Sequence, residues 1–335
     1  MGWLRLLALT SALVLAAPLA RADEPFEIRA AWAAVPGQLF PVLMQMKDVL
    51  HHYGKSYTVA AIRAPGSGPQ TTALASGDIN LAYFAPSAFA LAIQNAHMDD
   101  IKLIGEATRD GYDDYYTRQF AVKADSPIRK VEDLKGKVIG DNSIGGAMDL
   151  GMRYMLKRHG LEDKTDYSVV EIEFPNMMAA LNAGRVDLGF LTTPFSIAPV
   201  KSGAVRVLFT MKEAMGGETE LTIIAARAPF IAAHRAALVD YFEDTGRALR
   251  WILDPANRSA ALKLVADFAK RPVSTYEGWL FLKGDDFHAV DSRPSVAAMQ
   301  KNLDIQKKLG MLKMDIDVKA HSDLSLVDEA AARLR

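Results

Sequence analysis

The chain of 335 residues contains no cysteine. This absence excludes disulfide bonds, thiol nucleophiles and thiolate metal sites. It also excludes a lipid-modified cysteine, so we expect no lipid tether to a membrane. The seven histidines are dispersed, and the adjacent pair His51 and His52 points to different sides of its predicted helix. We therefore expect no metal site and no cofactor.

An excess of charge of one sign is also lacking. The sequence has 39 Lys and Arg residues against 40 Asp and Glu residues, with a formal net charge of −1. The basic residues are scattered and form no run that would follow a nucleic-acid backbone, so we expect no nucleic-acid partner. The composition, 50% hydrophobic and 24% charged, is typical of a globular protein with one large or two medium domains.

Long apolar runs are confined to the first 22 residues. Arg5 precedes an apolar stretch over residues 6–20, and "ARA" at residues 20–22 has the small residues of a signal-cleavage site. We interpret residues 1–22 as a secretory signal, cut before Asp23. A membrane anchor is the weaker alternative, because a helix needs about 20 apolar residues to span a bilayer. We expect the mature chain to be a soluble periplasmic protein.

Nucleotide and hydrolase motifs are missing too. Residues 145–149, "GGAMD", lack the Lys-Ser or Lys-Thr of a Walker phosphate loop. Residues 66–71, "GSGPQT", do not complete the dinucleotide fingerprint G-x-G-x-x-G. In residues 140–145, "GDNSIG", the serine comes one place too late for a G-x-S-x-G nucleophile elbow. A hydrolase is therefore unsupported, and we assign no catalytic residue.

What the sequence does contain is an alternation of strand and helix patterns. Strand, helix, strand, helix end and strand are expected in turn at residues 26–33, 39–52, 57–62, 71–76 and 79–84. This order predicts a mostly parallel sheet. The same order returns from residue 137 onward.

The two copies align when Ala73 is placed opposite Ala180. The segment "ALASGDINLAYFAP" from Ala73 then matches "ALNAGRVDLGFLTT" from Ala180, with Gly77 opposite Gly184. Chance explains a short match, because helix, glycine and strand follow one another in many α/β proteins. It does not explain the whole order of five elements. We therefore predict two similar α/β lobes.

The remaining segments complete the two lobes. Residues 101–125 are expected to form a connection leading into a strand at 119–122, and a further strand is expected at 221–226. Helices are expected at 229–254, 258–271, 275–282 and 295–309. They have no counterpart in the second copy, so we place them on the first lobe, and the chain crosses between lobes twice. The proposed division is a signal (1–22), lobe 1 (23–108 and 211–335) and lobe 2 (109–210).

Loops at helix starts are the candidate binding elements. In parallel sheets these loops share one edge, where helix N-termini offer unpaired amides and a positive dipole. Two such edges face to face form a cleft suited to an anion. Asn142, Ser143 and the amides near Gly145 and Gly146 would hold carboxylate, sulfonate or phosphonate oxygens. The alternative is a capped strand-to-helix turn without a ligand.

Aromatic residues near these loops are candidate walls, because a solute site needs apolar surface around a few polar groups. Trp32 and Phe195 are the preferred candidates, although either fits ordinary core packing as well. Arg63 and Arg109 would pair with an anion, but surface ion pairs explain such arginines equally well.

Three segments carry a resemblance to a known family. They are "VEDLKGKVIGDNSIGGAMDLGMRYMLKRHGL" (131–161), "FPNMMAALNAGRVDLGFLTTPF" (174–195) and "SGPQTTALASGDINLAY" (67–83). These resemble the nitrate, sulfonate and taurine type of substrate-binding proteins of ABC importers, a family that includes NMT1/THI5-like proteins. The likeness covers nearly the whole mature chain.

The resemblance implies a type II periplasmic-binding-protein fold, with two α/β lobes around a central cleft and a two-stranded hinge. It implies a monomer that closes on a small anionic organic solute and delivers it to the ABC permease in the inner membrane, with no chemistry. Together with the helix-start loops, it places the ligand among a defined set of residues. These are Trp32, Pro36, Gly37, Gln38, Ser67, Gly68, Ala85, Ser87, Asn142, Ser143, Gly145, Gly146, Asn176, Thr192, Thr193 and Phe195.

The loops at residues 36–38 and 141–146 depart from the commoner Gly-Ser-Thr types of the family, so taurine or alkanesulfonate is not carried over as the solute. Some relatives make a pyrimidine with a cysteine-containing motif, which this chain lacks. The alternatives are a pyrimidine-binding or aromatic-binding protein or enzyme of the same group, or a ligand-sensing partner of a membrane receptor.

Overall fold

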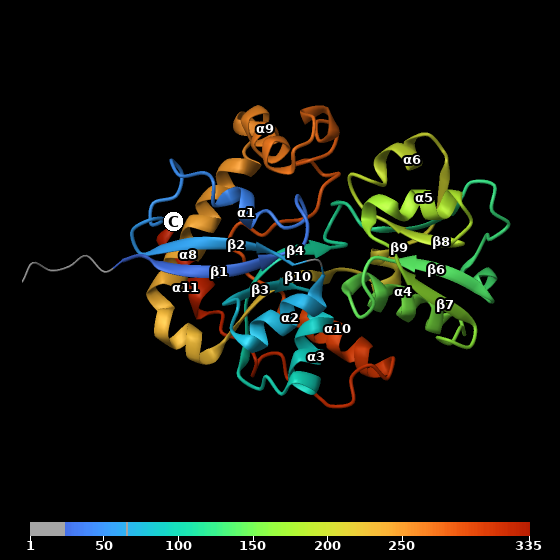
Figure 1. Ribbon diagram of the computed structural model, residues 1–335, viewed down its shortest axis with the longest axis horizontal. Coiled ribbons are helices and arrows are strands. Elements are labelled where there is room, and N and C mark those ends of the chain that lie inside the picture. The colour runs from blue at the N-terminus through green and yellow to red at the C-terminus, as the bar shows by residue number, and fades with distance from the viewer. Residues whose placement is uncertain (1–23, 65) are drawn as a thin grey trace, which may run out of the picture.

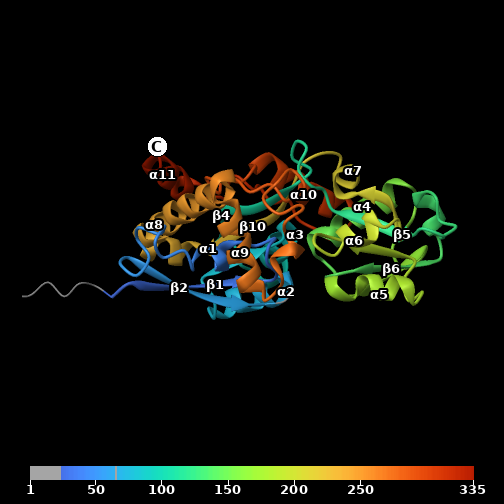
Figure 2. The same cartoon turned by 90° about the horizontal axis from the view of Figure 1, so that it is seen from above.

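The computed structural model describes residues 24–64 and 66–335, so the predicted signal at residues 1–22 lies outside the described part. The chain forms two lobes side by side, each built on its own five-stranded sheet (Figures 1 and 2). Among the described residues, none of the helices combines the length and apolar character needed to cross a membrane. The predicted α/β class with two lobes is confirmed.

The first sheet has the strand order β2-β1-β3-β10-β4. Strands β1, β2 and β3 are parallel, whereas β10 runs antiparallel to both β3 and β4. The strands are β1 (Phe26–Trp32), β2 (Tyr57–Arg63), β3 (Leu81–Phe84), β4 (Ile101–Asp110) and β10 (Thr219–Arg227).

The second sheet repeats this arrangement in the order β7-β6-β8-β5-β9. Strands β6, β7 and β8 are parallel, and β5 runs antiparallel to β8 and β9. The strands are β5 (Gln119–Lys123), β6 (Lys137–Asp141), β7 (Tyr167–Glu171), β8 (Leu188–Leu191) and β9 (Val205–Thr210).

The internal repeat is confirmed at residue level. Strand β3 begins at Leu81 and β8 at Leu188, which are opposite each other in the alignment of the two copies. The aligned Gly77 and Gly184 both adopt positive φ, 81° and 66°. Glycine adopts this left-handed conformation without the steric cost that a side chain brings, so each glycine ends a helix and turns the chain into the next strand.

Helices cover both faces of the first sheet, and the late helices pack there as predicted. One face is covered by α1 (Phe40–Leu43), α8 (Ala228–Leu253), α9 (Arg258–Ala269) and α11 (Ser325–Arg333). The other is covered by α2 (Ser67–Ser76), α3 (Pro86–Ala96) and α10 (Val296–Lys308). The second lobe carries α4 (Ala147–Arg158), α5 (Met177–Asn182), α6 (Ile197–Lys201) and α7 (Met211–Met215).

Three predicted elements are wrong. The helix expected at 39–52 is reduced to α1, and tight turns follow it that still bury Met44 and Met46. The connection expected from residue 101 begins with strand β4, whose two faces are both largely buried, so no clean alternation marked it. The helix expected at 275–282 is a short 3₁₀ turn, Val273–Thr275, followed by further turns.

The chain passes between the lobes at two places. It leaves the first sheet at the end of β4 and enters the second at β5, and it returns between β9 and β10. The proposed divisions after residues 108 and 210 lie close to the ends of β4 and β9. These paired crossings are the two-stranded hinge of the fold.

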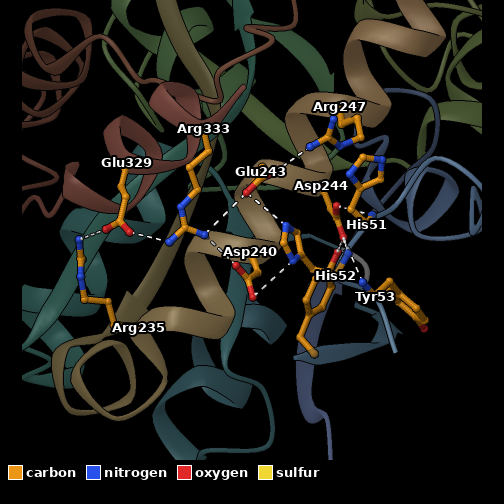
Figure 3. A network of polar contacts seen from close by, with 11 residues as sticks. His51, His52, Tyr53, Arg235, Asp240, Glu243, Asp244, Arg247, Glu329 and Arg333 are labelled. Carbon is orange, nitrogen blue, oxygen red and sulfur yellow. Dashed lines mark hydrogen bonds and ion pairs between the residues drawn. The ribbon is translucent and has the colours of Figure 1, made fainter. Parts of the chain in front are cut away.

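A polar network joins the C-terminal helix to α8 on the side of the first lobe away from the second (Figure 3). Arg333 of α11 donates a hydrogen bond of 2.9 Å to Asp240 and lies 3.7 Å from Glu243. His52 lies beside the same two carboxylates, at 3.7 Å and 3.2 Å. His52, Asp240 and Glu243 have the spacing of metal ligands, but Arg333 and Arg247 already pair with the two carboxylates.

Candidate functional site

A cavity of about 850 Å³ lies between the two lobes. Its lining comes from loops at the carboxyl ends of β1, β2 and β3 in the first lobe and of β6, β7 and β8 in the second. This is the sheet edge at which parallel α/β folds bind ligands. The two predicted sets of loops therefore face one another across one cavity.

Most of the predicted ligand-binding residues line this cavity. They are Trp32, Pro36, Gly37, Gln38, Ser67, Gly68, Ala85, Asn142, Ser143, Gly146, Thr192, Thr193 and Phe195. Three predicted residues do not. Ser87 is fully buried in the first turn of α3, Asn176 is exposed at the end of a 3₁₀ turn, and Gly145 faces a smaller adjacent hollow.

Two glutamines hold the first-lobe loops against the end of strand β3. Gln38 donates from Nε2 to the Tyr83 carbonyl at 2.9 Å and accepts from the Ala33 amide at 2.6 Å. Gln70 accepts from the Tyr83 amide at 2.9 Å. The Gln70 Nε2 is buried and has no partner among the described residues.

Ser67 has a structural role at the same edge. Its Oγ accepts a hydrogen bond of 3.1 Å from the Ala85 amide, which ties the start of α2 to the start of α3. The hydroxyl therefore fixes the relative position of two loops that line the cavity.

The anion-binding turn predicted in the second lobe is already occupied by the protein's own oxygens. The amides of this turn donate to carboxylates or to a carbonyl of the chain rather than into the cavity. The pairs are Ser143 to Asp141 (3.0 Å), Ile144 to Glu171 (2.7 Å), Gly145 to Asp149 (2.9 Å) and Gly146 to the Ser143 carbonyl (2.9 Å). The turn at residues 143–146 therefore offers no free amide to a ligand. The Ser or Asn cap of the alternative interpretation is not seen either, because α4 begins after Gly146 without a side-chain cap.

Burial changes the ionisation of the carboxyls behind this turn. Desolvation, followed by the nearby charge of Asp149, raises the pKa of Asp141 to about 8. The pKa of Asp149 is also raised by burial, against the charge and hydrogen bond of Arg153. Asp141 therefore holds a proton at neutral pH, and Arg153 compensates the charge of Asp149.

Aromatic rings form much of the cavity wall. In the first lobe, Trp32 lies against Phe268 with ring centroids 5.6 Å apart. In the second, Phe174 packs edge-on against Phe190, also at 5.6 Å. Phe195 completes the wall from the loop after β8. The Trp32 Nε1 is shielded from solvent and has no partner in the described part of the chain.

Residues at the end of α9 and in the turns after it complete the site. They were not predicted from the sequence. The end of α9 and the turns after it contribute Phe268, Arg271 and Tyr276 to the lining. The Arg271 guanidinium lies 5.5 Å from the Phe195 ring centroid, so this contact joins the two lobes. No local signal marks these residues, because only the tertiary packing of α9 on the first lobe brings them to the cleft.

Three other arginines differ in their availability. Arg118 lines the cavity, but it donates two hydrogen bonds of 2.8 Å to Asp286 and one of 3.2 Å to Asp110. Its charge is therefore compensated. Arg63 lines the cavity, and its guanidinium has no hydrogen-bond or ion-pair partner among the described residues. Arg109, the other predicted cation, lies outside the lining and pairs with Glu106 at 2.9 Å.

The lobes approach closely at one point of the cavity rim. Gly66, at φ 91°, faces Ser143 of the second lobe, and a Cβ added at Gly66 would come within 3.3 Å of the Ser143 Oγ. This contact joins first-lobe and second-lobe loops that were predicted from the sequence to form one site.

Solved structures similar to this one share its fold. The periplasmic aliphatic sulphonate binding protein SsuA from Escherichia coli matches with a TM-score of 0.65 and 20% identity, over 89% of this chain and 92% of that one. The periplasmic nitrate-binding protein NrtA from Synechocystis PCC 6803 matches with a TM-score of 0.72 and 16% identity, over 94% and 90%.

The desulfurization enzyme DSZB also shares the fold, with a TM-score of 0.65 and 13% identity over 92% of this chain and 100% of that one. No curated protein sequence is a significant match to this chain. The model of the NMT1-like family matches residues 22–266, which is most of the sequence. The fold and this match agree with the resemblance seen in the three sequence segments, and the chain belongs to the NMT1-like family.

Proposed function

We propose that this protein is the periplasmic solute-binding component of an ABC importer. It captures a small organic anion between its two lobes and delivers it, unchanged, to a permease in the inner membrane. The observation that carries this proposal is the large cavity of about 850 Å³, lined from both lobes at the carboxyl ends of equivalent strands.

Hinged closure is the mechanism that this architecture supports. Two lobes joined by paired crossings move as rigid bodies around a ligand and bury it. The Arg271–Phe195 contact and the approach of Gly66 to Ser143 each join opposite lobes and tighten as the cleft closes. The closed form then presents one continuous surface to the permease.

The shared fold supports the proposal, because two proteins of this fold are periplasmic binding proteins. SsuA and NrtA are described as periplasmic binding proteins for sulphonate and nitrate. An exported, periplasmic location fits both these neighbours and the predicted signal at residues 1–22. A monomer is sufficient, because both halves of the site come from one chain.

An enzyme is the second candidate function, because DSZB has the same fold. One structure of a DSZB mutant is described as a complex with biphenyl-2-sulfinic acid. The present chain has no cysteine, so a thiol cannot act in it. The hydroxyls that line the cavity, including Ser143, Thr192 and Thr193, have no histidine beside them among the described lining residues.

The test is to express the full chain with its signal, purify it from the periplasm, and identify any small molecule released on denaturation by mass spectrometry. The solute should then be added back to the purified protein. At a concentration of about 100 times its dissociation constant, a ligand stabilises the folded protein by about 2.7 kcal/mol. We expect a higher melting temperature and chemically unchanged solute after incubation. Conversion of the solute would favour the enzyme instead. Both candidate functions would be refuted if neither a co-purified nor an added solute shifts the melting temperature.

A further inference from the structure

The size of the cavity limits the class of solute. At about 850 Å³ it lies in the upper part of the range, about 300–1,000 Å³, that is usual for sites of drug-sized ligands. The lobes approach each other at Gly66 and Ser143, but elsewhere the cavity is open to solvent. An anion of four or five heavy atoms would leave most of the space to water. A larger body is needed to fill the cleft.

The chemistry of the walls indicates an aromatic body. Trp32 and Phe268 of the first lobe lie at an interplanar angle of 58°, with centroids 5.6 Å apart. Phe174 and Phe195 face the same cavity from the second lobe. Aromatic side chains bury about 150–250 Å² each and pair with other rings in offset or edge-to-face arrangements. A planar aromatic solute therefore contacts apolar surface of both lobes at once.

The position of the anionic group follows from which donors are uncommitted. The amides of the 143–146 turn are bonded to the protein's own oxygens, and Arg118 is held by Asp286. The Arg271 guanidinium, in contrast, has no hydrogen bond or ion pair with any residue that the structure describes. The same holds for the Arg63 guanidinium, but only that of Arg271 lies against an aromatic ring of the second lobe. The Arg271 guanidinium lies over the Phe195 ring, which places a positive charge directly beside the aromatic wall.

Two further donors face no acceptor. The Trp32 Nε1 and the Gln70 Nε2 are shielded from solvent and unpartnered in the described part of the chain, and both residues line the cavity. A buried donor without a partner costs free energy, and an acceptor atom on a ligand removes that cost. Neither nitrogen is exposed, so these side chains would donate to a ring heteroatom, a hydroxyl or an oxygen of the anionic group only after rotating toward the cavity.

We propose that the solute is an aromatic acid of about two-ring size, with its rings between Trp32 and Phe195 and its anionic group on Arg271. This rests on the proposed solute-binding function and names its substrate class. Closure then brings the second-lobe wall onto the rings while Arg271 of the first lobe holds the charge. The cleft therefore selects for an aromatic body and a single negative group together, rather than for a small oxyanion.

The test uses the full chain and four probes: 2-naphthoate, its neutral amide 2-naphthamide, nitrate and methanesulfonate. Binding is measured by calorimetry and by tryptophan fluorescence. We expect naphthoate to bind at least tenfold more tightly than the amide and at least a hundredfold more tightly than nitrate or methanesulfonate. Arg271→Gln should weaken naphthoate binding at least tenfold and leave the amide unchanged. Arg271→Lys should keep part of the preference for the acid.

The matched control is Arg185→Gln, which changes an exposed second-lobe arginine outside the cavity and should leave all affinities unchanged. Equal affinity for nitrate and naphthoate, or an equal loss of acid and amide in Arg271→Gln, would overturn the inference. The inference would also be overturned if Arg63→Gln abolished the preference for naphthoate over the amide while Arg271→Gln retained it. Binding of only the small anions would overturn the inference but leave the solute-binding function intact, whereas the extraction experiment alone decides that function.

Discussion

Arg118 and Asp286 form a two-pronged ion pair that joins the connection between the lobes to the C-terminal part of the first lobe. The two terminal guanidinium nitrogens, Nη1 and Nη2, each donate to Asp286 at 2.8 Å. Both side chains are more than nine-tenths buried. Asp110, at the end of β4, accepts from the same guanidinium. Burial alone would lower the pKa of Arg118, but the charges of Asp286 and Asp110 outweigh burial and raise it, so the arginine stays charged. The hinge region is therefore organised around one arginine.

Replacing Asp286 should destabilise the protein strongly. In Asp286→Ala the buried Arg118 guanidinium loses its bidentate partner. Removing one partner of a buried ion pair typically lowers the free energy of unfolding by about 3–5 kcal/mol. Urea unfolding measures the change in the free energy of unfolding. The matched control is Asp267→Ala at the exposed pair with Lys263, which should leave the free energy of unfolding within error of the wild type. Equal effects of the two variants would contradict this account of the hinge.

The protonated state of Asp141 predicts a pH dependence of stability. Its pKa is about 8 in the folded protein and about 4 in an unfolded chain, so the folded state holds the extra proton between these values. Its stabilising contribution is complete below about pH 4 and is lost as the pH rises through 8, at up to about 1.4 kcal/mol per pH unit.

Asp141→Asn removes this titration while keeping a neutral side chain of the same shape. We expect the variant to gain stability relative to the wild type as the pH rises from 5 to 8, measured by urea unfolding at each pH. A difference between the two proteins that stays constant over this range would show that Asp141 titrates normally in the fold.

Asp244 of α8 should be a sensitive position, because it anchors the loop before β2. It is fully buried on α8 and accepts from the amides of His51 (2.7 Å) and His52 (2.9 Å) and from the Tyr57 hydroxyl (2.9 Å). Asp244→Ala leaves these donors buried without an acceptor, at a cost of roughly 3 kcal/mol or more. Thermal unfolding measures the loss, with the exposed Asp267→Ala as control. An unchanged melting temperature would contradict this role.

The rim contact between Gly66 and Ser143 predicts a coupled pair of variants. Gly66→Ala introduces a side chain at φ 91°, within 3.3 Å of the Ser143 Oγ, so it should hinder the approach of the lobes and weaken solute binding about tenfold or more. Adding Ser143→Ala should restore part of the affinity. Gly54→Ala introduces a side chain at a similar φ, 78°, but outside the cavity and with no atom within 4 Å, so it serves as control. Equal affinities of the Gly66 and Gly54 variants would refute the prediction.

The repeat was predictable because helix ends and strand starts carry strong local signals. Gly77 and Gly184 mark equivalent turns, and the apolar segments after them begin at the equivalent positions Leu81 and Leu188. Local pattern and tertiary structure agree in these elements. Strand β4 was missed because it carries Glu106 and other charged groups into a buried network, which hides its strand pattern.

The site was predictable only as far as loop positions go. The order of strands and helices predicted that both sets of loops lie at one cleft. It did not predict which oxygens accept hydrogen bonds from the loop amides. Asp149, four residues after Gly145, accepts from the Gly145 amide, and Glu171 reaches the Ile144 amide from the end of β7; neither pairing was predicted. Arg271 reaches the cleft through the packing of α9, although it lies far along the chain from the second-lobe loops. Such contacts depend on tertiary structure that no local pattern encodes.

The most direct measurement of the central claim is a calorimetric titration of the full chain with its extracted solute, compared between two tryptophan variants. Thr192→Trp fills the cavity from the second lobe, and Thr165→Trp places the same side chain at an exposed position outside it. We predict one solute per chain for the wild type and Thr165→Trp, and at least a hundredfold weaker binding for Thr192→Trp. Undiminished binding by Thr192→Trp, in a variant that still folds, would show that the solute is not held between the lobes.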